Sequence, residues 1–182
     1  MVVNNESLPV VSIAQPPQFC EYAGGPCDQN FGGLSHSHGL FLYPSTPEII
    51  ASTIEAAVHT LRQISPDRRW LTWKDLGISG QIIFCQICKA LRVTRAVYAD
   101  VTTLNFNLLF EIGYALSLRI PVLPLRDTSF QTDQKKFDEL GLLDTLGYLD
   151  FANSSSLASS IDNHIPVSSF FPGHQFTINV FV

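Results

Sequence analysis

Short apolar segments alternate with amphipathic segments along the chain from residue 38 onward. The first apolar segment, HGLFLYPS at 38–45, predicts a buried strand that ends in a Pro-Ser turn. In the next segment, 46–63, apolar residues recur at helical spacing. It opens with Thr46, Pro47 and Glu48, which predict an N-cap, a first helical residue and an acidic first turn. This part of the chain is therefore predicted to be a strand followed by a helix.

The same alternation continues to residue 165. Further strands are predicted at 69–76, 94–101, 120–125 and 147–151, and further helices at 79–93, from about Asn105, around 133–143 and at 154–165. Strands that alternate with helices in this way favour parallel pairing through right-handed crossovers. We therefore expect a flavodoxin-like, doubly wound sheet of about five parallel strands with helices on both faces. In such a sheet the ligand crevice lies outside the carboxyl ends of the strands.

These patterns divide the chain into three parts. Residues 1–37 are rich in Pro, Gly, Gln and Ser and have no sustained period, which indicates an irregular N-terminal arm. Residues 38–165 contain the predicted α/β domain. Residues 166–182 end in alternating apolar residues, which fits either an added strand or the start of a further segment.

The composition is typical of one soluble domain. Of 182 residues, 46% are hydrophobic and 15% are charged, which is enough for one sizeable core. A formal charge of −5 with only 11 Lys and Arg argues against direct nucleic-acid binding, but it is compatible with a small anionic ligand. No apolar run reaches the roughly 20 residues of a membrane span, and the first residues show no signal-peptide pattern. We therefore expect a cytoplasmic protein that does not enter a membrane.

One carboxylate interrupts the most apolar predicted helix. Glu111 shares a helical face with Asn107 and Tyr114, and apolar residues cover the rest of the helix. Burying an unpaired carboxylate is costly, or it raises the pKa until the group takes up a proton. Glu111 is therefore either a structural carboxylate, which binds backbone amides or pairs with Arg126, or a functional one. Gly113, in the middle of the same helix, indicates that a neighbouring backbone or a ligand comes close.

This helix carries a family resemblance. Asp100, Asn105, Asn107 and the segment FEIGYA at 110–115, followed by an apolar strand, resemble the pattern of TIR-like and nucleoside 2-deoxyribosyltransferase-like domains. The clear resemblance covers roughly residues 95–125. In both groups a glutamate on this helix acts at the anomeric carbon of a ribosyl or deoxyribosyl group. The resemblance thus implies that Glu111 is catalytic. It also implies that Asp100, Asn105, Asn107 and Tyr114 bind the substrate.

The chemistry of an N-glycosidic bond fits a single carboxylate. The bond breaks through an oxocarbenium-like state, which a carboxylate beneath the sugar stabilises or attacks. Nicotinamide leaves NAD without protonation because it already carries positive charge, whereas a neutral base needs a proton. The transferases often have an aspartate six positions before the glutamate, where this chain has Asn105. The resemblance therefore favours a TIR-like hydrolase that cleaves NAD, needs no cofactor, and is activated by assembly with a partner domain or with further copies.

Two alternatives stay open. The first is a nucleoside 2-deoxyribosyltransferase or a nucleotide N-glycosidase. The second is a non-catalytic module that senses a nucleotide or self-associates, in which Glu111 only holds a ligand. A scaffold has no need of Asn107, Glu111 and Tyr114 aligned on one apolar helix, which favours the two enzymes.

Further candidates follow the predicted strands. Tyr43, Ser45 and Thr46 come after the first strand, where a helix N-terminus could bind a phosphate, although plain capping by Thr46 is the simpler interpretation. Asp100 either holds a ribose hydroxyl or caps the next loop.

Aromatic and charged residues offer similar alternatives. Trp70, Trp73 and Tyr114 either stack on a base or fill the edge of a core. Arg126 and Asp127, just past the fourth strand, are expected to pair with each other.

The four cysteines raise a separate possibility. Cys85 and Cys88 share a helical face, and Cys20 and Cys27 flank a Gly-rich segment, so four thiolates could bind a structural zinc ion. In the alternative, Cys85 and Cys88 pack against the sheet as small apolar residues. His36 and His38 indicate no more than a polar turn before the first strand, from which they could approach the ligand crevice.

Overall fold

The chain divides into two compact units, Met1–Gly32 and Gly33–Val182. The computed structural model describes residues 19–20, 25–27, 35–77, 83–103, 105–130 and 147–163. In the first unit, strand β1 (Phe19–Cys20) pairs antiparallel with strand β2 (Gly25–Pro26). The second unit contains the α/β domain.

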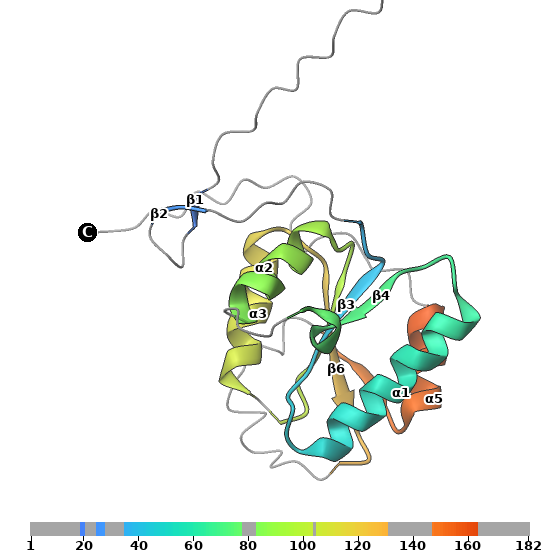
Figure 1. The fold of residues 1–182 in the computed structure, drawn as a ribbon. Helices are drawn as coiled ribbons and strands as arrows, with labels where there is room; N and C mark the ends of the chain where they lie inside the picture. The colour runs from blue at the N-terminus through green and yellow to red at the C-terminus, as the bar shows by residue number, and fades with distance from the viewer. Residues whose placement is uncertain are drawn as a thin grey trace, which may run out of the picture. The chain divides into compact units, whose positions relative to one another are not determined.

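A five-stranded parallel sheet forms the centre of the second unit, in the order β4-β3-β5-β6-β7 (Figure 1). Its strands are β3 (Gly39–Leu42), β4 (Trp70–Thr72), β5 (Val97–Asp100), β6 (Val122–Asp127) and β7 (Leu149–Phe151). Numbered by their order along the chain, these strands have the 2-1-3-4-5 arrangement of flavodoxin-like sheets, with the switch point between β3 and β5. The expected parallel α/β sheet is confirmed.

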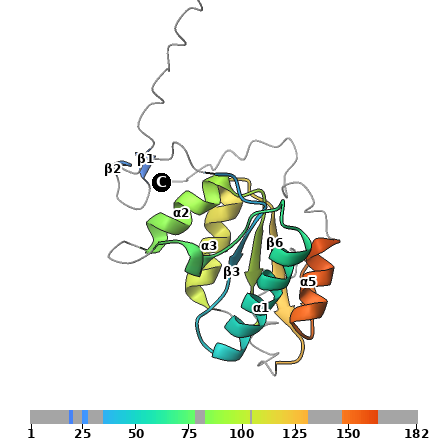
Figure 2. The same cartoon turned by 45° about the vertical axis from the view of Figure 1, so that its right-hand side comes forward.

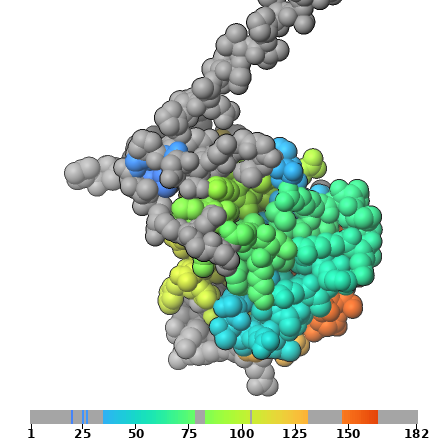
Figure 3. All heavy atoms as spheres, in the orientation of Figure 1, coloured from blue at the N-terminus to red at the C-terminus, as the bar shows by residue number. Residues whose placement is uncertain are grey.

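Helices cover both faces of the sheet (Figure 2). Helices α1 (Glu48–Ile64) and α5 (Ser154–Asp162) pack together on one face, and α2 (Ile83–Val93) and α3 (Phe106–Ser117) cover the other. The space-filling view shows α1 in teal, with the orange atoms of α5 beside it (Figure 3). The fold is therefore doubly wound, as its sequence pattern predicts.

Two hydrophobic clusters, one on each side of the sheet, make up the core. Successive residues of a strand point to opposite faces, and β3 follows this rule. Phe41 and Tyr43 pack in the cluster beneath α1 and α5, and Leu40 and Leu42 pack in the cluster beneath α2 and α3. Because β3 is buried on both faces, it is a continuous apolar run rather than an alternating one.

The structure corrects two predicted element boundaries. The strand predicted at 69–76 ends at Thr72, because the Asp75 carboxylate accepts hydrogen bonds from Thr72 N at 2.7 Å and Thr72 Oγ1 at 2.8 Å. Residues Trp73–Asp75 then form a short 3-10 helix, η1. Helix α1 begins at Glu48, and Pro47 occupies the N-cap with extended backbone angles (φ −73°, ψ 146°). The prediction that Thr46 caps this helix is therefore wrong.

Some predicted features lie outside the described residues. These are most of the irregular arm predicted at 1–37, the helix around 133–143 and the segment 166–182. Within the part of the chain that is described, no helix combines the length and the apolar character that crossing a bilayer requires.

Gly39 and Gly113 have opposite surroundings. A Cβ on Gly39 would lie 2.5 Å from Tyr98 Cε2 and 2.9 Å from Trp70 Cζ3, and both of these rings are buried. A Cβ on Gly113 would meet no atom of a described residue outside its own helix within 4 Å. The idea that a neighbouring backbone requires Gly113 is therefore wrong, whereas Gly39 is required by the packing of the aromatic core.

This contrast gives a stability prediction. We expect Gly39→Ala to destabilise the protein by about 1–3 kcal/mol, because the two buried rings must move. Gly113→Ala, its matched control, should stabilise α3 by up to about 1 kcal/mol, because alanine is the better helix former. Urea unfolding of both variants measures the difference. Equal free energies of unfolding would show that the aromatic core does not constrain residue 39.

Candidate functional site

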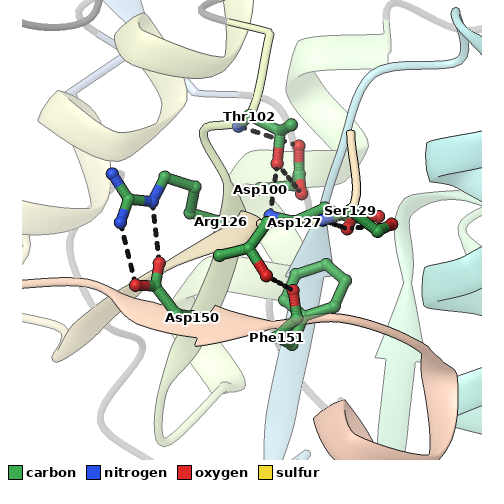
Figure 4. Close-up of polar contacts among 8 residues, drawn as sticks. Asp100, Thr102, Arg126, Asp127, Ser129, Asp150 and Phe151 are labelled. Atoms are coloured by element: carbon green, nitrogen blue, oxygen red, sulfur yellow. Dashed lines mark hydrogen bonds and ion pairs between the residues drawn. The ribbon is translucent and has the colours of Figure 1, made fainter. Parts of the chain in front are cut away.

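Side-chain hydrogen bonds join the carboxyl ends of β5 and β6 (Figure 4). Asp100, the last residue of β5, is only 1% exposed. Its carboxylate accepts hydrogen bonds from Thr102 N at 3.1 Å and from Thr102 Oγ1 at 2.9 Å. Thr102 Oγ1 in turn accepts a hydrogen bond from the Asp127 N–H at the end of β6, at 2.9 Å. The loop after β5 is thereby fixed against the neighbouring strand.

The end of β6 repeats this arrangement. The Asp127 carboxylate accepts hydrogen bonds from Ser129 N at 2.8 Å and from Ser129 Oγ at 2.6 Å. Neither Thr102 nor Ser129 is among the predicted site residues. The pattern Asp-x-Thr/Ser, repeated at the ends of two neighbouring strands, is the sequence signal that identifies them.

Asp100 has the environment of a buried structural carboxylate. Burial raises its pKa to about 7, and the nearby Asp127 charge also raises it, while the hydrogen bonds from Thr102 act in the opposite direction. Of its two predicted roles, capping of the next loop is the one that these bonds match.

Arg126 pairs with a residue that the sequence does not suggest. Its Nε and Nη2 donate to Asp150 Oδ1 at 2.7 Å and Oδ2 at 2.8 Å, so β6 and β7 are joined by a two-point ion pair. Because neighbouring residues of a strand point to opposite faces, Arg126 and Asp127 do not meet. The predicted Arg126–Asp127 pair is therefore wrong, and the structure forms no Arg126–Glu111 pair either.

Helix α3 places Glu111 in its second turn. The helix begins after Asn105, whose side-chain oxygen accepts hydrogen bonds from Asn107 N at 2.9 Å and Leu108 N at 3.4 Å. Glu111 is half-buried, and it makes no hydrogen bond or ion pair with any described residue. Burial alone raises its pKa to about 7. Loss of hydration is thus the cause of the raised pKa.

The other members of the predicted polar stripe have different surroundings. Asn107 is exposed. The Tyr114 hydroxyl lies 3.1 Å from Cys88 Sγ on α2, and its ring contacts Phe84 with the centroids 5.2 Å apart. Burial raises the pKa of Tyr114 to about 12. Tyr114 is therefore directed towards α2.

Of the three candidates after β3, Tyr43 is buried in the core, and Ser45 and Thr46 are exposed. The Tyr43 ring packs against Trp73, and its hydroxyl donates to Glu55 Oε1 at 3.1 Å. Burial raises the pKa of this phenol. Ser45 and Thr46 are exposed beyond the strand end. Only these two of the three therefore have side chains open to a ligand in solution.

The two tryptophans belong to the hydrophobic clusters. Trp70 is buried between Phe41 and Tyr98, so it fills the core. Trp73 is half-buried and packs at the edge of both clusters. For Trp70, the core interpretation is the one that the packing supports.

The cysteines are distributed over both units. Cys85 and Cys88 are half-buried on α2, whereas Cys20 and Cys27 belong to the first unit. In the described part of the chain, no three or more His, Cys, Asp or Glu side chains are grouped to hold a metal ion. The four-cysteine zinc site stays a prediction.

Solved structures share this fold at low sequence identity. The chain superposes on a conserved protein from Enterococcus faecalis with a TM-score of 0.51 and 16% identity, over 70% of this chain and 98% of that one. It superposes on the TIR domain of a Toll-related receptor from Hydra magnipapillata with a TM-score of 0.50 and 14% identity. This superposition covers 69% of this chain and 92% of that one. The superposition on a CMP N-glycosidase from Clostridium botulinum has a TM-score of 0.47 and 14% identity. It covers 68% of this chain and 97% of that one.

The first two likenesses show the fold alone. No family model matches the chain, and no curated protein sequence matches it.

The Thr102 hydrogen bonds give a second stability prediction. We expect Thr102→Val to destabilise the protein by about 1–3 kcal/mol, because it removes the hydroxyl donor to buried Asp100 and leaves the Asp127 N–H without its acceptor. Thr103→Val is the matched control, because the half-buried Thr103 side chain makes no hydrogen bond with a described residue. Chemical denaturation measures both variants. Equal losses would contradict a structural role for the Thr102 hydroxyl.

The raised pKa of Glu111 gives a third prediction. A carboxyl group with a pKa of about 7 in the folded state and 4.5 unfolded reduces stability as the pH rises from 4.5 through 7. The melting temperature of Glu111→Gln, relative to the native protein, should therefore be higher at pH 8 than at pH 4.5. The same change at exposed Glu48 is the control. A difference that does not vary with pH would contradict the shifted pKa.

Proposed function

We propose that the protein cleaves the N-glycosidic bond of NAD and releases nicotinamide, with Glu111 as the catalytic carboxylate. The observation that carries this proposal is the placement of Glu111, which is half-buried and makes no hydrogen bond or ion pair with any described residue. The fold, which is shared with a TIR domain, supports the proposal at the level of architecture.

The contrast between Glu111 and the structural carboxylates supports a role in ligand binding. Asp75, Asp100, Asp127 and Asp150 each accept hydrogen bonds from protein donors at 2.5–3.1 Å. Glu111 bears the cost of lost hydration without such compensation. A positively charged group beside it would supply that compensation. The sugar of a nicotinamide nucleotide acquires this charge as its glycosidic bond breaks.

The proposed reaction needs one carboxylate in its ionised form. The bond between the ribose anomeric carbon and the nicotinamide nitrogen breaks, and its electron pair leaves with nicotinamide, which becomes neutral. The Glu111 carboxylate stabilises the positive charge that develops on the ribosyl group. Water then bonds to the anomeric carbon and releases a proton, which gives ADP-ribose. A different nucleophile at this step gives cyclisation or base exchange instead of hydrolysis.

A nucleotide N-glycosidase is the second candidate, and the pKa of Glu111 favours it. At a pKa of about 7, the group is substantially protonated at neutral pH. A protonated Glu111 could donate its proton to a neutral leaving base, which departs poorly as an anion. Asn105 does not separate the two candidates, because it caps α3 and either Asn or Asp serves that purpose.

We propose that activity depends on assembly with a partner domain or with further copies. Phe106 and Phe110 on α3 are 83% and 56% exposed, and large exposed apolar residues are typical of contact surfaces. Phe110 adjoins Glu111 in sequence, so a contact there would alter hydration of the carboxylate. We further propose a cytoplasmic enzyme with NAD as substrate and no required cofactor; any zinc at the cysteines would be structural.

The direct test is release of nicotinamide from NAD, measured by mass spectrometry at high protein concentration. We expect Glu111→Gln to abolish it, and Glu48→Gln, a matched change on exposed α1 surface, to leave it unchanged. The native rate should rise with pH to a plateau above about 7, because the ionised carboxylate is the active form. Nicotinamide release that survives in Glu111→Gln would overturn the assignment.

The pH dependence of the rate distinguishes the nucleotide N-glycosidase from the enzyme that cleaves NAD. A nucleoside monophosphate should lose its base with a rate that falls above about pH 7, because the protonated carboxyl is then the active form. Binding of NAD and of the monophosphate without turnover of either would instead favour the non-catalytic module.

A further inference from the structure

A pocket lies at the amino edge of the sheet, opposite to the carboxyl edge that carries the candidate site. Its volume is about 290 Å³. Its lining comes from the three segments that precede β3, β4 and β5, and consists of His36, Ser37, His38, Asp67, Arg68, Arg69 and Arg95. These segments are distant in sequence, and the parallel pairing of the three strands brings them together.

The pocket concentrates positive charge in an acidic protein. Three of the 11 Lys and Arg residues line it, against one acidic residue, Asp67, although the formal charge of the chain is −5. Arg68 pairs with Asp162 at 3.1 Å, and Arg69 Nη1 donates to the Ser35 carbonyl at 3.0 Å. The Arg95 guanidinium makes no hydrogen bond or ion pair with any described residue. Among the described residues, the contacts of the pocket therefore leave one guanidinium group without a partner.

Ser37 supplies a second group that the fold does not use. It is 1% exposed, and its hydroxyl has no hydrogen-bond partner among the described residues. Its backbone is fully engaged, because Ser37 N donates to Val93 O at 3.0 Å and Ser37 O accepts from Arg95 N at 3.1 Å. These bonds fix Ser37 next to Arg95. A buried hydroxyl without a partner is uncommon, because leaving it unpaired is costly.

The charges of Arg68 and Arg95 both act on His38. Burial lowers its pKa, and the charges of Arg68 and Arg95 lower it further, while Asp67 and Asp162 act in the opposite direction. The imidazole ring is held edge-on against Trp70, with the centroids 4.8 Å apart. Arg68, before β4, and Arg95, before β5, therefore both lower the pKa of the same imidazole.

We propose that this pocket binds the phosphate group of a small ligand, at a site separate from the N-glycosidic site. Arginine guanidinium groups bind phosphate oxygens through paired hydrogen bonds, and Arg95 is available for such a contact. After rotation of its side chain, the Ser37 hydroxyl could donate to a further oxygen. A volume of about 290 Å³ suits a phosphate with a small attached group, and it lies just below the usual range for larger ligands.

Titration with inorganic phosphate and pyrophosphate, followed by NMR of the histidine side chains at constant ionic strength, tests the proposal. We expect saturable binding and a rise in the pKa of His38, because a bound anion offsets the charges of Arg68 and Arg95. His59, exposed on α1, is the internal control and should not respond. Chloride that produces the same change at the same ionic strength would overturn the proposal, since it would show general screening.

Two variants locate the site. Arg95→Gln should weaken phosphate binding by about tenfold or more, as expected for loss of a charge-assisted contact. Arg119→Gln is the matched control, because Arg119 is exposed in the segment before β6 and does not line the pocket. Ser37→Ala should weaken binding severalfold without lowering the melting temperature, because its hydroxyl has no partner to lose. Equal losses in Arg95→Gln and Arg119→Gln would overturn the site.

Phosphate binding at this pocket does not depend on the proposed N-glycosidase activity. Glu111→Gln should bind phosphate as the native protein does, because Glu111 does not line this pocket. If the native protein binds phosphate but cleaves no N-glycosidic bond, the phosphate site is supported and the proposed activity is not. Loss of phosphate binding in Glu111→Gln would contradict two separate sites.

Discussion

The hydrogen bonds through Thr102 hold together the part of the molecule on which the candidate site depends. They join the buried carboxylate of Asp100 to the backbone of Asp127, and so fix the end of β5 against the end of β6. The loop that they anchor leads directly to Asn105, which caps α3 and thereby sets where the helix begins. Where α3 begins sets the position of Glu111 in its second turn. These hydrogen bonds therefore fix the strand end and the helix start that place a half-buried carboxylate with no partner among the described residues.

The two edges of the sheet differ in charge. At the carboxyl edge, Asp100 and Asp127 end two neighbouring strands, and Glu111 follows on the next helix. At the amino edge, Arg68 and Arg95 precede two strands. The first edge carries the proposed N-glycosidic site, and the second carries the proposed phosphate site. One fold can therefore present two ligand chemistries on opposite sides, with no residue shared between them.

Periodicity was enough to predict the fold, because each strand and helix buries a face of its own. Contacts between elements were harder to predict. Arg126 and Asp127 are adjacent in sequence but point to opposite faces of β6, and the partner of Arg126 is Asp150 on the next strand. Tyr114 shares a helical face with Glu111 in the sequence pattern, yet its hydroxyl contacts Cys88 on a neighbouring helix. The amino-edge pocket was not predicted, because its arginines meet only after three strands align.

The central claim is that Glu111 acts at the anomeric carbon of a nucleotide. The measurement that tests it most directly is a crystal structure of Glu111→Gln with NAD, in which the substrate is retained because turnover is blocked. We predict that the anomeric carbon next to nicotinamide lies within about 3.5 Å of the residue 111 side chain, as near-attack geometry requires. NAD bound with this carbon away from residue 111, or no NAD bound at all, would contradict the claim.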